Sequence, residues 1–80
     1  MKTTQTIEIP YEVLMECLGI LTRNRIKTEL TQADDKAGLI TVNVIYDKSS
    51  YINRKAMDNI TQICNDFTSL IFDRYANNSL

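Results

Sequence analysis

The last third of the chain constrains the fold most, because its pattern is that of one long amphipathic helix. Apolar residues recur at spacings of three and four from Tyr51 to about Ala76, and they share one face of a helical wheel. The members of this face are Ile52, Ala56, Ile60, Ile63, Cys64, Phe67, Leu70 and Ile71. Ser49 or Ser50 is placed to cap the helix at its start. In a chain of 80 residues, this leaves the first 50 to build whatever the helix packs against.

The start of the chain predicts a strand followed by a shorter helix. Isoleucines alternate with polar residues within Thr3–Ile9, which is the period of a half-buried strand. Pro10 ends this strand because it cannot donate a ladder hydrogen bond, and its fixed φ suits the start of a helix. We therefore expect a helix over Pro10–Arg23, with Asn24 as a left-handed cap. Its apolar face collects Val13, Leu14, Cys17, Leu18 and Leu21.

Two segments in the middle of the chain predict an antiparallel hairpin. Ile26–Gln32 alternates in polarity, and Leu39–Tyr46 is rich in β-branched and aromatic residues. The residues between them have turn chemistry, since Asp34 and Asp35 favour the opening of a turn and Gly38 accepts a positive φ. Turn formation also explains the two aspartates without any catalytic role.

The predicted element order is strand, helix, strand, strand, helix. The fold class is thus α+β: one two-layer β-α-β-β-α domain over residues 1–80, with a three-stranded mixed sheet in the order 1-3-2 and both helices on one face. The third strand is placed in the middle because it is the most apolar. Expected inward-facing residues are Ile7, Ile9, Ile26, Thr28, Leu30, Ile40, Val42 and Val44. In element order alone, this arrangement resembles a ferredoxin-like fold that lacks its last strand.

Composition excludes several classes of function. The 9 basic and 10 acidic residues are mixed along the chain, so we expect no one-sided basic field, and a nucleic-acid partner is disfavoured. The chain has no histidine and no Cys-x-x-Cys pair, and we expect no metal, no cofactor, no catalytic residue and no enzyme activity. Cys17 and Cys64 fall on apolar helix faces, where we expect small buried hydrophobes. No membrane span is apparent, and we expect a cytoplasmic protein.

The end of the long helix is the expected interaction site. A helix of this length exceeds the strands beneath it, so we expect roughly its last ten residues to overhang the sheet. The expected contact residues are Phe67, Leu70, Ile71, Phe72, Arg74 and Tyr75. We expect a homodimer formed through this end or through an open sheet edge, or else contact with another protein. Arg74 has two interpretations. It could form an ion pair across the interface, or its aliphatic stem could lie on apolar surface while its guanidinium stays in water.

Two other functions remain as alternatives. Tyr46 and Tyr51 could stack bases of a single-stranded nucleic acid beside Arg54 and Lys55. A small molecule or an anion could bind near Asp47–Ser50, at the start of the long helix. Simple helix capping explains the second pattern equally well.

Overall fold

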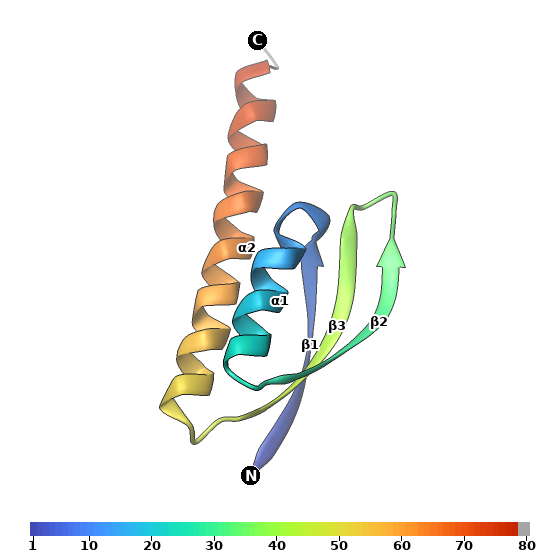
Figure 1. Cartoon of the computed structure of the whole chain (residues 1–80). Coiled ribbons are helices and arrows are strands. Elements are labelled where there is room, and N and C mark those ends of the chain that lie inside the picture. Colours follow the sequence, from blue (N-terminus) through green and yellow to red (C-terminus); the bar gives the residue numbers. More distant parts are fainter. Residues whose placement is uncertain (79–80) are drawn as a thin grey trace.

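The computed structural model describes the backbone of residues 1–78 and the side chains of residues 1–70. Its elements, in chain order, are β1 (Lys2–Pro10), the 3₁₀ turn η1 (Tyr11–Val13), α1 (Leu14–Arg23), β2 (Lys27–Asp34), β3 (Leu39–Asp47) and α2 (Tyr51–Asn78). Both helices lie on the same side of the sheet, and α2 runs along the outside of α1 (Figure 1). The α+β class and the predicted order of elements are confirmed.

The sheet has the predicted strand order β1-β3-β2. β3 pairs with β1 in a register that joins Lys2 to Asp47, and with β2 in a register that joins Lys27 to Ile45. Both pairings are antiparallel, so the expected mixed sheet is wrong. β1 and β2 do run in the same direction, but the central strand separates them and no parallel ladder forms.

The first helix begins later than the proline signal suggested. Pro10 closes β1 opposite Leu39, and its ψ of 142° is that of extended chain. One 3₁₀ turn then reverses the backbone, and α1 starts only at Leu14. At the other end of α1 the left-handed residue is Arg25, with φ 56°, instead of the expected Asn24. Asn24 itself has φ −97° and ψ 10°, and its side-chain amide donates to the Ile20 carbonyl at 2.7 Å.

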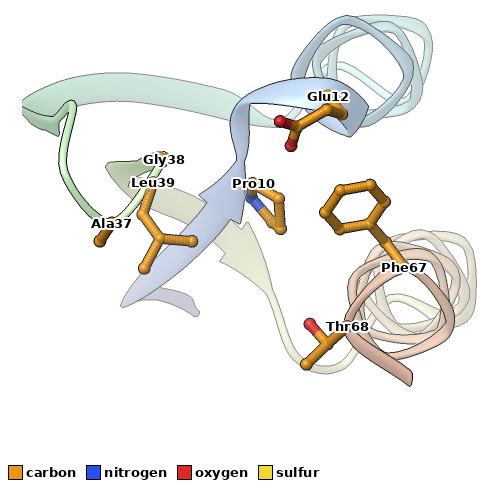
Figure 2. Close-up of a pocket in the computed structure, with 7 residues that line it drawn as sticks. All are labelled: Pro10, Glu12, Ala37, Gly38, Leu39, Phe67 and Thr68. Atoms are coloured by element: carbon orange, nitrogen blue, oxygen red, sulfur yellow. The ribbon is translucent and has the colours of Figure 1, made fainter. Parts of the chain in front are cut away.

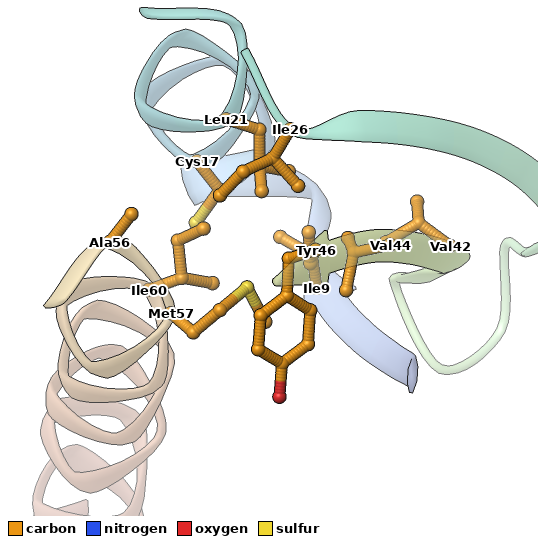
Figure 3. Close-up of a cluster of buried hydrophobic side chains, with 10 residues drawn as sticks. All are labelled: Ile9, Cys17, Leu21, Ile26, Val42, Val44, Tyr46, Ala56, Met57 and Ile60. Atoms are coloured by element: carbon orange, nitrogen blue, oxygen red, sulfur yellow. The ribbon is translucent and has the colours of Figure 1, made fainter. Parts of the chain in front are cut away.

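The core lies between the two helices and the β1–β3 half of the sheet (Figure 3). Its buried side chains are Ile9, Cys17, Leu21, Ile26, Val42, Val44, Tyr46, Ala56, Met57 and Ile60. Every element except η1 and β2 contributes at least one of them, and Ile26 precedes the first residue of β2. The helices therefore cover the first and central strands and leave the second strand outside the core.

One sequence-based prediction of burial, that of Leu30, is wrong for this reason, and the burial of Ile52 and Tyr46 also depends on how the elements pack. Leu30 is 58% exposed because β2 is an edge strand beyond the helices and carries an irregularity between Leu30 and Gln32. Ile52 is 62% exposed because the first turn of α2 precedes its contact with the body. Tyr46 faces inward and is 7% exposed, because the alternation of β3 continues to its end and places it beside Val44 on the inner face.

Candidate interaction surfaces

α2 is longer than the body against which it packs. Its 28 residues span about 42 Å at 1.5 Å per residue, while the nine residues of β3 cover about 30 Å. The long axis of the molecule, 50 Å, follows this helix. Figure 1 shows the C-terminal turns of α2 continuing past the ends of α1 and of the sheet. This agrees with the predicted overhang.

A shallow groove of about 340 Å³ lies where α2 leaves the body (Figure 2). Its apolar wall consists of Pro10 and Leu39 on one side and the Phe67 ring on the other. Glu12 and Thr68 add a carboxylate and a hydroxyl to its rim. Phe67, expected in the overhang, is therefore half-buried at the last point where α2 still faces the rest of the chain.

The β2–β3 turn and η1 fix the floor of this groove. The Tyr11 amide donates to the Gly38 carbonyl at 2.9 Å, and the Tyr11 hydroxyl donates to Asp35 Oδ1 at 2.6 Å. This hydrogen bond, together with the negative charge of Asp35, raises the pKa of Tyr11 to about 12. Gly38 has φ 68°, a conformation that other residues adopt at a cost. Asp34 Oδ1 accepts from two turn amides at 3.1 Å, which confirms its predicted structural use.

Of the six predicted contact residues, the structure describes the side chains of two. Leu70 is 52% exposed, one turn beyond the groove, and Phe67 lines the groove itself. The side chains of Ile71, Phe72, Arg74 and Tyr75 lie outside the described residues. Their backbone continues α2 without a break to Asn78.

A second surface arises at the opposite end of the molecule, where the topology collects basic residues that are scattered in the sequence. Because both outer strands are antiparallel to β3, the starts of β1 and β2 meet the end of β3. α1 connects the end of β1 to the start of β2, so its last turn returns to that end, and α2 begins there (Figure 1). The residues placed here are Lys2, Arg23, Arg25, Lys27, Lys48, Arg54 and Lys55, which we call the basic end.

The basic end holds seven of the nine lysine and arginine residues, and all seven side chains are exposed. Three carboxylates lie in or next to the same segments: Glu29, Asp47 and Asp58. Among the described side chains, the ion pair found is between the Met1 amine and Asp47 at 3.8 Å, so no carboxylate lies that close to any of the seven cations. The basic and acidic residues are therefore mixed along the chain, as expected, but the folded protein gathers most of the basic residues at one end.

The proposed stacking cluster is only partly assembled. Tyr46 is buried, and its hydroxyl donates to Gln5 Oε1 at 2.9 Å, so it offers no free ring face. Tyr51 is 66% exposed, and Lys55 Nζ lies 5.9 Å from the centre of its ring. Arg54 donates to the Lys48 carbonyl at 2.8 Å, which fixes the guanidinium over the β3–α2 junction.

Two hollows adjoin at Arg54. One, of about 410 Å³, is lined by Tyr51, Arg54, Lys55, Asp58 and Asn59. The other, of about 400 Å³, is lined by Tyr46, Lys48, Arg54, Met57 and Asp58. Both offer side-chain hydrogen-bonding groups beside a cation, which is chemistry suited to a charged, aromatic ligand.

The polar groups of Asp47–Ser50 are used within the chain. Asp47 Oδ1 accepts from the Ser49 hydroxyl at 2.6 Å and from the Ser49 amide at 2.9 Å. These hydrogen bonds lower the pKa of Asp47. Ser50 Oγ accepts from the Asn53 amide at 3.2 Å, so Ser50 is the predicted N-cap of α2. Because these groups are already hydrogen-bonded within the chain, the geometry supports capping.

The two cysteines meet in the core, which their separation in the sequence did not suggest. Cys17 on α1 is fully buried, and Cys64 on α2 is partly buried against the same cluster. Both are free thiols. Burial, with smaller contributions from the neighbouring thiol, raises the pKa of Cys17 to about 12, and burial also raises the pKa of Cys64. Raised values disfavour the thiolate, so neither sulfur is an activated nucleophile.

Within the described residues, no group of three or more Cys, Asp or Glu side chains is arranged to hold a metal ion. No helix in the described part of the chain has both the length and the apolar character needed to cross a membrane. Comparison with protein families, with curated proteins and with solved structures gives no match. The resemblance to a ferredoxin-like fold therefore stays a prediction from element order.

Proposed function

We propose that this protein is a non-enzymatic interaction module that pairs with a second copy of itself through the exposed end of α2. The observation that carries the proposal is the position of Leu70. This large apolar side chain is 52% exposed one turn beyond the groove, on a helix that continues for eight more residues. An apolar surface on a helix that has left its own body is typical of an interface.

The length of the overhang supports a partner. Beyond Thr68 the helix runs for ten residues, or about 15 Å, with no described element at its side. A helix shorter than about 12–15 residues is marginal in water on its own, and most helices in proteins are stabilised by packing of an apolar face. Burial of Leu70 against another surface would supply that packing.

The charge pattern around Leu70 favours a second copy as the partner. Asp66 lies four residues before Leu70, and Arg74 lies four residues after it. In an antiparallel pair with its two-fold axis at Leu70, helical position 66 of one copy lies opposite position 74 of the other. Each Asp66 then faces the partner's Arg74, and the two Leu70 side chains face each other. The open edges β1 and β2 are a second route to pairing, but the irregularity in β2 and the exposed Lys27 and Glu29 oppose it.

The test is the mass of the protein in solution across a dilution series, measured by sedimentation equilibrium. We expect wild type to approach two chains per particle as concentration rises, and Leu70→Glu to remain a single chain. Ser69→Glu is the matched control, because it adds the same charge in the same turn at an exposed position about 100° around the helix. We expect Ser69→Glu to dimerise nearly as wild type does.

Charge exchange tests the register. Asp66→Arg alone and Arg74→Asp alone each place like charges opposite each other and should weaken the dimer, while the double variant should restore it. A wild-type protein that stays monomeric at millimolar concentration would refute the proposal. Masses that grow beyond two chains would also refute it, because they indicate head-to-tail stacking of a basic end on the opposite end.

A further inference from the structure

We infer that the basic end binds single-stranded nucleic acid, with Tyr51 as the stacking residue and Arg54, Lys48 and Lys55 as its phosphate contacts. This inference does not rest on the proposed dimer, since the basic end and the α2 overhang lie at opposite ends of the long axis. It replaces the Tyr46-containing cluster suggested by the sequence with a surface that the fold assembles.

Charge is the first argument. The molecule as a whole has a formal charge of −1, yet seven exposed cations, none of them in an ion pair with a described carboxylate, share an end whose cross-section is of the order of 24 × 17 Å. A concentrated group of exposed Lys and Arg side chains releases counterions from a phosphate backbone, and this release drives nucleic-acid binding. Among the remaining acidic residues, Glu12 in η1 and Asp34 and Asp35 at the β2–β3 turn lie at the other end. This uneven distribution of charge favours approach of a polyanion to the basic end.

The aromatic residue is the second argument. Tyr51 begins α2 with 66% of its surface exposed, so one ring face can receive a base while Lys55 lies over the ring at 5.9 Å. Base stacking on exposed aromatic residues beside cations is how proteins bind single strands without reading a fixed sequence. In a duplex, the bases already stack on each other and offer no face to Tyr51.

The hollows beside Arg54 favour nucleic acid over an anionic membrane or an acidic peptide. The hollow next to Tyr51 presents the Asn59 amide, which can donate to and accept from the edge of an unpaired base, and the Asp58 carboxylate, which can accept from it. A flat lipid surface would leave this hollow empty, and an acidic peptide has no base edge to meet its hydrogen-bonding groups. An unpaired nucleotide uses the cation, the ring and the hydrogen-bonding groups together.

The experiment is fluorescence anisotropy of a labelled oligothymidylate titrated with the protein at several salt concentrations. If about four phosphates are neutralised, the affinity should fall about 50-fold between about 50 and about 200 mM salt. Lys55→Glu should weaken binding by about tenfold and make the salt dependence shallower. Tyr51→Ala should also weaken binding by about tenfold but leave the salt dependence unchanged, because stacking releases no counterions.

Lys36→Glu is the matched control. It makes the same change in net charge at an exposed lysine in the β2–β3 turn, away from the basic end. We expect it to bind as wild type does, and an equal loss in Lys36→Glu and Lys55→Glu would overturn the site. Leu70→Glu should bind with wild-type affinity per chain, so the dimer can fail while this inference stands.

Two further probes decide the class of ligand. A duplex of the same length should bind more weakly than the single strand, and equal binding would overturn the role of Tyr51. Vesicles of phosphatidylcholine with phosphatidylserine, tested by co-sedimentation, should retain little protein. Binding to these vesicles without binding to the oligonucleotide at low salt would overturn the inference and assign the basic end to a membrane surface.

Discussion

Two leucines that the sequence placed in the core provide the sharpest test of how the helices cover the sheet. Leu21 on α1 is fully buried, whereas Leu30 on β2 is 58% exposed. Replacement of a buried leucine by alanine removes its transfer free energy and leaves a cavity, at a cost of about 3 kcal/mol. Full burial of a leucine is worth about 2 kcal/mol, so the covered part of Leu30 contributes about 0.8 kcal/mol. Leu21→Ala and Leu30→Ala should therefore differ in stability by about 2 kcal/mol.

The difference is large for a chain of this size. A domain of 80 residues is expected to have a free energy of unfolding of about 4–12 kcal/mol, so Leu21→Ala should remove a quarter or more of it. Urea unfolding followed by far-ultraviolet circular dichroism measures both variants, at one chain concentration because pairing would add stability. Equal losses would show that the helices cover β2 as well, and the reasoning from an uncovered edge strand would then be wrong.

Two smaller predictions concern the cap of α2 and the buried thiols. Ser50→Ala removes the acceptor of the Asn53 amide and should lower the free energy of unfolding by about 1 kcal/mol in the same urea assay, while the exposed Ser69→Ala should change it little. The pKa of Cys17 is raised from 9 to about 12 in the folded protein, so the folded state holds its thiol proton more tightly than the unfolded state does. The contribution of the Cys17 thiol to the free energy of unfolding is fully present below pH 9 and is lost as pH rises toward about 12. The urea midpoint of the wild type should fall from pH 8 to 9 to 10, and the midpoint of Cys17→Ala should fall less steeply. Equal slopes for the two proteins would contradict a raised pKa for Cys17.

The regular elements were predictable because each is specified by residues close together in the chain. Alternation in Thr3–Ile9 and the β-branched and aromatic content of Leu39–Tyr46 indicated strands, and the turn chemistry of Asp34 and Gly38 indicated the hairpin between the second and third strands. The amphipathic pattern after Ser50 indicated one long helix. Strand order followed from placing the most apolar strand in the centre, where it pairs with one neighbour on each side.

The set of sheet residues that the helices bury could not be predicted in the same way, because it depends on where the helices lie over the sheet. The periodicity of β2 placed Leu30 on the inner face, but only the position of α1 and α2 decides whether anything lies above it. The contact of Cys17 with Cys64 likewise depends on how α1 packs on α2. The position of Tyr46 was available from the alternation of β3, which places it on the same face as Val42 and Val44.

The basic end was also within reach of the sequence, but only after the topology was known. Lys2 and Lys27 each begin a strand, Arg23 ends a helix, and Arg54 and Lys55 lie in the first turn of another. In a strand–helix–strand–strand–helix chain with the order 1-3-2, all of these positions fall at one end. Along the chain, acidic and basic residues are interspersed and the charge looks even. The excess of basic residues at one end appears only when residues are grouped by the end of the strand or helix that holds them.

The two proposals meet in the geometry of the dimer. If two copies pair through their α2 overhangs, their basic ends point away from each other, separated by on the order of 80 Å, given a long axis of 50 Å per copy and about 15 Å of overlap. A short oligonucleotide then reaches one end only, and each chain binds it independently. A strand long enough to reach both ends makes the second contact intramolecular and gains affinity through effective concentration, which Leu70→Glu abolishes without touching either binding surface. Dimerisation would in this way favour long single strands over short ones, although each basic end makes the same contacts with both.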